Sequence, residues 1–281
     1  MNIELLLIVI VLVYIFTNIT FSQENYSPFI TKSENNERIL NNNNFEVYII
    51  HMAKNANRLE NFDNFYNKSD ISFKKYTVFP AIVGANLKLS NFVTPKAYAQ
   101  ILDVEKIKKR QHHYDLTRGA VGCFLSHLSI YKKVAESKID YAIIFEDDSV
   151  IANDFYERLE KGLRDIPSDW DIILLGLTCL KCDIKLDYIT VNRFWGTHGY
   201  IIKNKSAIKL LEYLDRPLSK QIDADISLLI KRKLINVYGI NPIIVAQESA
   251  FKSDIQMDVI DSNEAFNEEF KQNQLNRYLK N

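Results

Sequence analysis

Three consecutive carboxylates, Glu146, Asp147 and Asp148, are the residues of this 281-residue sequence that most clearly could do chemistry. They directly follow an apolar run at 142–145, which is typical of a strand covered on both faces. Because ligands bind beyond the carboxyl ends of parallel strands, we expect the carboxylates at the mouth of a site. Adjacent carboxylates repel one another unless a cation or hydrogen-bond donors compensate, and oxygen ligands at this density suit Mg²⁺ or Mn²⁺. A solvated acidic turn is the alternative for the triplet taken alone.

The composition excludes some classes of protein. Apolar residues make up 47% of the chain, which is enough for a sizeable core and argues against general disorder. Lys plus Arg and Asp plus Glu number 35 each, so the formal net charge is zero and no global basic field can collect nucleic acid. We therefore expect no nucleic-acid partner.

The three cysteines, Cys123, Cys179 and Cys182, are too few for a disulfide scaffold. Cys179 and Cys182 form a single C-x-x-C, without a second cysteine or histidine pair to complete a zinc site. We interpret them as a pair in a loop, oxidised or not, rather than as a metal or redox centre.

The chain divides into four parts by composition. The run at 5–16 is unbroken apolar, so residues 1–22 are predicted to be a transmembrane anchor, with a cleaved signal peptide as the alternative. An Asn-rich stalk or linker is expected at 23–44, a folded domain at 45–250 and a polar tail at 251–281. With either N-terminal segment, the folded domain is expected to be lumenal or extracytoplasmic, or secreted after cleavage.

The folded domain alternates strand and helix patterns, which predicts an α/β fold with a mostly parallel central sheet. Residues 86–115 give no clear pattern, and a short amphipathic helix is expected in the tail at 263–279. Strands are expected at 45–51, 72–79, 141–145, 169–177, 194–202 and 242–246, and helices at 55–66, 116–137, 154–163, 204–214 and 221–231.

The helix expected at 116–137 has unusual features at its start. Thr117 can cap it, and Gly119 and Gly122 follow within two turns. Because Gly costs about 1 kcal/mol against Ala inside a helix, two glycines there suggest close approach by a backbone or a ligand. His127 on the same helix is expected to be a hydrogen-bonded core histidine more often than a ligand.

In this order, the segments resemble glycosyltransferase family 25, the group of lipooligosaccharide galactosyltransferases and procollagen galactosyltransferases. The resemblance covers most of the chain. Its markers are FPAIVGA at 79–85, LTRGAVGCFLSHLSIYKKV at 116–134, YAIIFEDDSV at 141–150, WDIILLG at 170–176 and GTHGYII at 196–202.

The resemblance implies a GT-A-like fold, with a mostly parallel sheet flanked by helices, for a catalytic domain at 45–250. It also implies a metal-dependent inverting transfer of a hexose from a UDP-sugar to a hydroxyl of a glycan or protein acceptor, assisted by Mn²⁺ or Mg²⁺. Galactose is favoured and glucose is possible. Such an enzyme would take part in glycoprotein or lipooligosaccharide biosynthesis.

The same resemblance assigns roles to the acidic triplet. Asp148 is the first candidate for direct metal contact. Asp147 is either a second metal ligand or, with Glu146, a group that holds the donor ribose or a metal-bound water. His198, in a Gly-flanked loop, is a further candidate metal ligand through its neutral imidazole, and a hydrogen bond at a strand edge is its alternative.

Four further residues are candidates for donor binding. Arg58, Arg118 and the backbone around Gly119 would meet the phosphates or uracil of the donor. A structural ion pair is the alternative for Arg58. Asp171 is expected either to contact the donor or to cap the strand that it begins.

An inverting transfer needs a base to take the proton of the acceptor hydroxyl. Asp223 and Asp225, at the start of the helix expected at 221–231, are the candidates, and the sequence does not choose between them. Helix capping alone also explains Asp223. The rival to the whole enzyme reading is a catalytically silent, membrane-anchored adhesion or binding protein with the same fold.

Overall fold

The computed structural model describes residues 44–110, 112, 114–248, 250–251 and 253–255. All of them belong to one compact unit. The apolar segment predicted at 1–22, nearly all of the stalk at 23–44 and the helix predicted at 263–279 lie outside the described residues. Within the described part of the chain, no helix is both long enough and apolar enough to cross a membrane.

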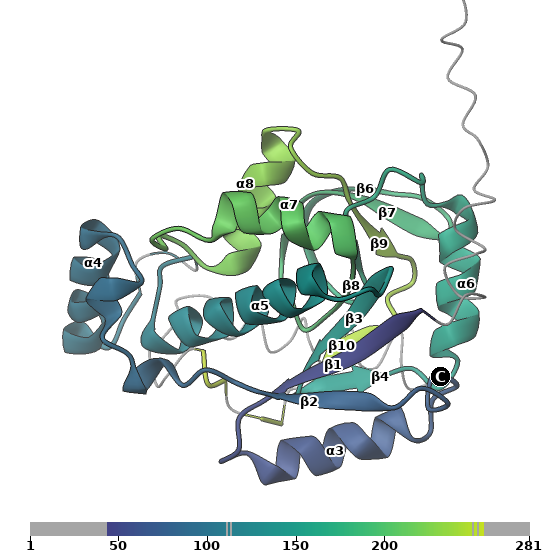
Figure 1. Ribbon diagram of the computed structural model, residues 1–281, viewed down its shortest axis with the longest axis horizontal. Helices are drawn as coiled ribbons and strands as arrows, with labels where there is room; N and C mark the ends of the chain where they lie inside the picture. The colour runs from purple at the N-terminus through teal and green to yellow at the C-terminus, as the bar shows by residue number, and fades with distance from the viewer. Residues whose placement is uncertain (1–43, 111, 113, 249, 252, 256–281) are drawn as a thin grey trace, which may run out of the picture. The chain divides into compact units, whose positions relative to one another are not determined.

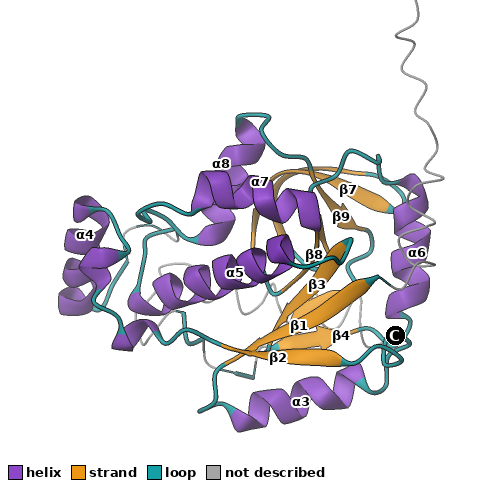
Figure 2. Ribbon diagram, in the orientation of Figure 1, coloured by secondary structure: helices purple, strands orange, loops and turns teal. Residues whose placement is uncertain are grey.

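Among the described residues, eight strands form one mixed sheet in the order β2-β1-β3-β8-β5-β9-β7-β6 (Figures 1 and 2). β1 pairs in parallel with β2 and β3, and β5 with β9, whereas β8 runs antiparallel between β3 and β5. β7 is antiparallel to both β6 and β9. The strands are β1 Phe45–His51, β2 Tyr76–Pro80, β3 Tyr141–Glu146, β5 Ile172–Leu174, β6 Thr178–Ile184, β7 Tyr188–Trp195, β8 Gly199–Lys203 and β9 Val237–Ile240.

A small antiparallel ribbon, β4 (Ser149–Ile151) with β10 (Val245–Gln247), lies beside the main sheet. Helices cover both faces of that sheet (Figure 2). The helices are α3 Ala56–Tyr66, α4 Pro95–Ile107, α5 Arg118–Glu136, α6 Phe155–Asp165, α7 Asn204–Leu214 and α8 Ile222–Lys231, with short 3₁₀ turns at Gly84–Asn86 and Leu89–Asn91.

The continuous apolar run of β3 is explained by these two covered faces. Ala142 and Ile144 pack in the core on the side of α5, α7 and α8. Ile143 and Phe145 point the other way, into the core beneath α3 and α6. Since alternate residues of a strand point to opposite faces, a strand between two helical layers must be apolar at every position. The predicted α/β fold with flanking helices is confirmed, and its strand pairing is mixed.

Several boundaries differ from the sequence-based expectation. The strand predicted at 72–79 begins at Tyr76, because the preceding backbone forms turns in which Ser72 N–H donates to Ser69 and Lys74 N–H donates to Ile71. The hairpin β6–β7 and the short strand β9 were not predicted. β6 is largely exposed, and β9 has four residues, so neither gives a strong hydrophobic pattern.

Residues 86–115 contain a helix that the sequence does signal. Thr94 accepts a hydrogen bond from Ala97 N–H at 3.2 Å, and Pro95 occupies the first helical position of α4. Both are recognised helix starts. The C-x-x-C lies in strand β6 rather than in a loop, and Cys179 and Cys182 form a disulfide.

Candidate active site

The acidic triplet lies at the carboxyl end of β3, beside the carboxyl end of β1. Glu146 is the last residue of β3 and is in register with Ile50 of the parallel strand β1. Asp147 and Asp148 form the turn that leads to β4. All three line a cavity of about 80 Å³, together with Arg58 of α3. The triplet is therefore built into a concave site at the end of the sheet.

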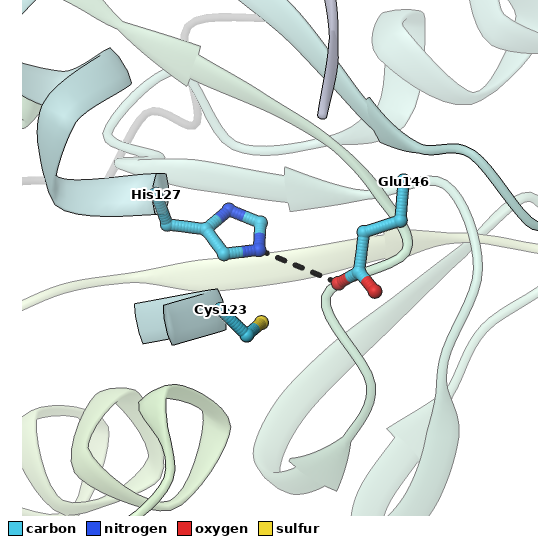
Figure 3. Close-up of side chains that lie close together, drawn as sticks. All are labelled: Cys123, His127 and Glu146. Atoms are coloured by element: carbon cyan, nitrogen blue, oxygen red, sulfur yellow. Dashed lines mark hydrogen bonds and ion pairs between the residues drawn. The ribbon is translucent and has the colours of Figure 1, made fainter. Parts of the chain in front are cut away.

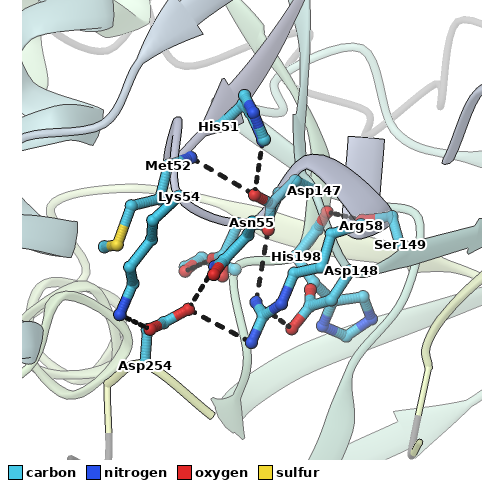
Figure 4. A network of polar contacts seen from close by, with 12 residues as sticks. His51, Met52, Lys54, Asn55, Arg58, Asp147, Asp148, Ser149, His198 and Asp254 are labelled. Carbon is cyan, nitrogen blue, oxygen red and sulfur yellow. Dashed lines mark hydrogen bonds and ion pairs between the residues drawn. The ribbon is translucent and has the colours of Figure 1, made fainter. Parts of the chain in front are cut away.

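Asp147 is held by the protein on both carboxylate oxygens (Figure 4). Its Oδ2 lies 2.8 Å from His51 Nδ1 and accepts a hydrogen bond from Met52 N–H at 3.2 Å. Its Oδ1 accepts from Arg58 Nη1 at 3.2 Å, and the residue is only 5% exposed. This arrangement makes Asp147 the anchor of the acidic turn, with little capacity left for a metal or a ribose.

Arg58 connects the acidic turn to the end of the described chain. Its Nη1 faces Asp147 and also lies 3.7 Å from Asp148 Oδ2. Its Nη2 lies 3.2 Å from Asp254 Oδ2, as Figure 4 shows. The structural ion pair given as the alternative for Arg58 is thus present, and the guanidinium lines the cavity as well.

Glu146 belongs to a chain of hydrogen bonds that leads into the core. His127 Nε2 lies 3.3 Å from Glu146 Oε1 (Figure 3), and Thr197 Oγ1 donates to the same oxygen at 3.0 Å. On its other side, His127 Nδ1 lies 2.8 Å from the hydroxyl of Tyr200, which donates to Tyr131 at 3.1 Å. His127 is fully buried. The prediction of a hydrogen-bonded core histidine is confirmed, and His127 also orients Glu146.

The surroundings of Glu146 stabilise its ionised form. Burial alone would raise its pKa, but the hydrogen bond and charge of His127, the charge of His198 and the Thr197 hydroxyl outweigh burial and lower the pKa below its ordinary value of 4.5. A carboxylate that stays charged despite burial is available as a ligand for a cation or for hydroxyl groups.

This lowered pKa predicts the pH dependence of a Glu146→Gln variant. Because the pKa of Glu146 is lower in the folded than in the unfolded protein, its stabilisation is complete above 4.5 and is lost as the pH falls through the folded value. While His127 and His198 carry their charges, we expect the unfolding free energy of the wild type minus that of Glu146→Gln to shrink as the pH falls below 4.5. Urea unfolding across this range measures the difference.

Glu160→Gln is the matched control, since the Glu160 side chain is 44% exposed and only 3.9 Å from Arg164. The unfolding free energy of the wild type minus that of Glu160→Gln should change little with pH. A flat curve for Glu146→Gln as well would show that the His127 contact does not stabilise the ionised form.

The groups that could hold a metal differ from the predicted set. Among the described residues, the His, Cys and carboxylate groups with ligand atoms all within 4.8 Å of one another are Cys123, His127 and Glu146 (Figure 3). Asp147, Asp148 and His198 are not brought together in this way. Asp148 and Glu146 nevertheless line one cavity, and their oxygens fit a hard divalent cation such as Mn²⁺ or Mg²⁺.

His198 is buried in the loop before β8 and supports the site through its backbone. Its carbonyl accepts hydrogen bonds from Glu146 N–H at 3.0 Å and from Ser149 Oγ at 2.6 Å. Its ring packs so closely on Gly176 that a Cβ there would lie 2.4 Å from Nε2. These contacts fix the loop against the acidic turn, which agrees with the hydrogen-bonding alternative for this residue.

The start of α5 is covered by the last described residues. A Cβ at Gly119 would lie 2.2 Å from the carbonyl oxygen of Asp254. Thr117 Oγ1 accepts from Ala120 N–H at 3.0 Å as the helix cap and donates to the carbonyl of Ile255. The predicted close approach at Gly119 is confirmed, and the approaching group is backbone.

The structure places Asp171 away from the acidic turn, at the opposite end of the sheet. It precedes Ile172, which pairs with Ile202, whereas Glu146 lies at the Gly199 end of the same antiparallel strand. Its carboxylate accepts from Ser206 Oγ at 2.8 Å, Lys209 Nζ at 3.0 Å and Asn236 N–H at 2.9 Å. Asp171 therefore ties α7 to the strand that it begins, and donor contact is not what this geometry favours.

The structure also separates the two candidate bases. Asp223 Oδ2 accepts from Gly196 N–H at 3.1 Å, in the loop that carries Thr197, so it lies next to the groups that hold Glu146. Asp225 is 2% exposed and pairs with Arg216 at 3.1 Å, and its burial raises its pKa despite that cation. Asp223 is the better placed of the two.

Arg118 lies at the start of α5 with its side chain turned to α4. Its guanidinium pairs with Glu105, with Nη2 at 3.3 Å from Oε2. Neither cavity beside the acidic turn is lined by Arg118. To contact a nucleotide-sugar donor, the Arg118 guanidinium would have to break its ion pair with Glu105.

Four residues of the site were missed by sequence reasoning. His51 ends β1, and Lys54 and Asn55 follow it in the loop to α3, where polar residues after a parallel strand are a usable signal. Asp254 lies in the polar tail, and Asn55 Nδ2 donates to its carboxylate at 2.5 Å. The two residues are 199 positions apart, so no local sequence pattern could have predicted this contact.

A mixed sheet with an acidic turn beyond its parallel strands, and a cavity lined by that turn and by Arg58, defines an α/β domain with a candidate site at the carboxyl ends of those strands. The family model described as "Glycosyltransferase family 25 (LPS biosynthesis protein)" matches residues 44–226. The chain belongs to glycosyltransferase family 25.

Known relatives carry two kinds of name. Procollagen galactosyltransferase 1-B of Xenopus laevis is 30% identical over 191 residues, which are 64% of this chain and 30% of that protein. Procollagen galactosyltransferase 1-A of the same species is 29% identical and covers 72% of this chain and 33% of the relative. Inactive glycosyltransferase 25 family member 3 of Homo sapiens is 32% identical over 64% of this chain and 30% of its own length. The chain spans about a third of the length of these relatives.

A similar solved structure is that of A197 from STIV. It has a TM-score of 0.42 and 14% identity, and the match covers 75% of this chain and 86% of that chain.

Proposed function

We propose that this chain is a metal-dependent inverting glycosyltransferase, which moves a hexose from a UDP-sugar to a hydroxyl of a glycan or protein acceptor. Galactose is the first choice of sugar, since the relatives that match include proteins named procollagen galactosyltransferase. The observation that carries the proposal is the pair of carboxylates, Glu146 and Asp148, on one cavity with Arg58 in a chain of this family.

Each residue of the site has a task in this reaction. Asp148, with Glu146, would hold Mn²⁺ or Mg²⁺, which when bound supplies a Lewis acid for the diphosphate leaving group. Asp147 and Arg58 hold Asp148 in position through the contacts of the acidic turn. Asp223 takes the proton of the acceptor hydroxyl. At the same time the hydroxyl oxygen bonds to the sugar carbon, and the bond from that carbon to the phosphate oxygen breaks.

A catalytically silent protein with the same fold is the second candidate. The observation in its favour is that family relatives of comparable identity are named inactive, such as the human protein at 32%. The ionised, cavity-lining Glu146 and the Asp148 beside it favour the enzyme.

The test is UDP release by the full chain offered UDP-galactose, UDP-glucose and UDP-N-acetylhexosamines, with Mn²⁺ and with a chelator. The enzyme is supported when one donor turns over and the chelator stops the reaction. Metal-dependent binding of a UDP-sugar without turnover, across glycan and hydroxylated-peptide acceptors, would instead support the silent protein.

We also propose that the domain is lumenal or extracytoplasmic and anchored to a membrane by residues 1–22. The disulfide between Cys179 and Cys182 supports this placement, because disulfides persist in oxidising compartments. The unbroken apolar run at 5–16 supports the anchor. Carbonate extraction of membranes that carry the full chain tests it: an anchored chain stays in the membrane pellet, and a cleaved, secreted chain does not.

A further inference from the structure

A second, larger cavity of about 550 Å³ lies next to the acidic turn and carries a concentration of cations. Its lining includes Lys54 and Arg58 around the start of α3 and Lys108 after α4. Among the described residues that line it, Asp254 is the one carboxylate. The cavity shares Arg58 and Gly119 with the smaller cavity of the acidic turn, so the two cavities are adjacent.

The carboxylate of Asp254 collects the donors of this cavity (Figure 4). Its Oδ1 lies 2.6 Å from Lys54 Nζ, while its Oδ2 accepts from Asn55 Nδ2 at 2.5 Å and lies 3.2 Å from Arg58 Nη2. Two cations and an amide that converge on a single anionic group are the donor set typical of a bound phosphoryl group.

Asp254 is brought to these donors by backbone contacts that are independent of its charge. The carbonyl of Ile255 accepts from Thr117, and the Asp254 carbonyl passes over Gly119, where any Cβ would be too close. Phe251 precedes Asp254 in the chain, and its ring lies against Arg58. The distance from Arg58 Cζ to the centroid of the Phe251 ring is 5.5 Å. Phe251 and residues 253–255 thus lie against the residues that the two cavities share.

We propose that Lys54, Asn55 and Arg58 form a phosphoryl-binding subsite and that Asp254 is a built-in competitor for it. The inference rests on the proposed function in one respect: the phosphoryl group of interest is the diphosphate of a nucleotide-sugar. A phosphoryl group and the Asp254 carboxylate need the same donors, so binding of one requires the other to leave. The Asp254 carboxylate then sets the affinity of the subsite for the diphosphate of the nucleotide-sugar.

The test measures binding of inorganic pyrophosphate and of UDP to the full chain by calorimetry, in chelator and without any acceptor. Asp254→Asn keeps the shape of the side chain and removes its charge, so both probes should bind about tenfold more tightly than to the wild type. Uridine, which lacks a phosphoryl group, should bind both proteins equally. A gain with pyrophosphate as well as with UDP assigns the subsite to the phosphoryl group itself.

Two variants make the test specific. Asp165→Asn removes the same charge from an exposed position at the end of α6 and should leave all three affinities unchanged. Lys54→Gln, introduced into Asp254→Asn, should weaken pyrophosphate binding by about tenfold, because it removes a donor of the subsite. Thermal unfolding of each variant confirms that the fold is retained.

The proposal is overturned if Asp254→Asn binds pyrophosphate no better than the wild type does, or if Asp165→Asn gives the same gain. It is equally overturned if Lys54→Gln has no effect in the Asp254→Asn background. These outcomes are separate from failure of the proposed function, because the assay contains neither metal nor acceptor. A chain that shows the expected binding but never releases UDP from a sugar would keep the subsite and lose the enzyme.

Discussion

Asp148→Asn is expected to lower kcat/KM for UDP-sugar transfer by about a thousandfold, the scale of losing a metal-stabilised leaving group. The amide keeps the shape of the side chain but removes the charge that faces the cavity and Arg58. The backbone of the turn does not depend on this charge, since the Asp148 carbonyl accepts from Glu248 N–H at 2.8 Å. Steady-state kinetics at saturating Mn²⁺ measure the effect.

The control for this variant is Asp183→Asn, which changes an exposed carboxylate on the edge strand β6 and should leave kcat/KM within about twofold of the wild type. Unchanged melting of Asp148→Asn would assign its loss to chemistry rather than to folding. If Asp148→Asn kept most of its activity, Asp148 would not be at the reacting centre.

The second large effect is on stability. Arg58→Met should lower the unfolding free energy by about 3–5 kcal/mol, the usual cost of leaving a buried charge without its partner. Asp147 is 5% exposed and would lose the Arg58 guanidinium. Of its hydrogen-bond partners among the described residues, His51 and the Met52 amide would remain. Urea unfolding measures the loss.

Adding Asp147→Asn to Arg58→Met should recover part of this stability, because the remaining group is then neutral and no longer a buried anion. Arg164→Met is the matched control: its partner Glu160 is 3.9 Å away and both side chains are largely exposed, so a change under about 0.5 kcal/mol is expected. A loss below about 1 kcal/mol for Arg58→Met would show that Asp147 is adequately solvated without it.

The strands and helices that the sequence predicts well are those that bury continuous or regularly spaced apolar residues. β3 lies between two helical layers, and α5 begins with a Thr cap and keeps a helical period, so both could be predicted from local pattern. The hairpin β6–β7 is different: one of its strands is largely exposed, and its place in the sheet is set by pairing with β9, four residues long. This strand pairing depends on residues far away in the sequence, so a local sequence pattern does not reveal it.

The site follows the same rule. The position of Glu146, Asp147 and Asp148 follows from the strand that ends there. The different roles of the three carboxylates cannot be predicted in this way, because they depend on contacts with distant residues. Asp147 is held by His51 and Arg58, while Asp148 lines the cavity. Only the folded chain brings these partners together.

The place of β9 and β10 has a practical consequence for anyone who cuts this chain into fragments. The stretch that matches the family model ends at residue 226, within α8. β9 comes later in the chain but lies between β5 and β7, and β10 pairs with β4 directly after the acidic turn. A fragment that stopped at 226 would expose an open strand edge on β5, separate the β6–β7 hairpin from the sheet and invite aggregation. The smallest piece worth expressing therefore ends no earlier than residue 255, so the boundary of sequence similarity is not the boundary of the folding unit.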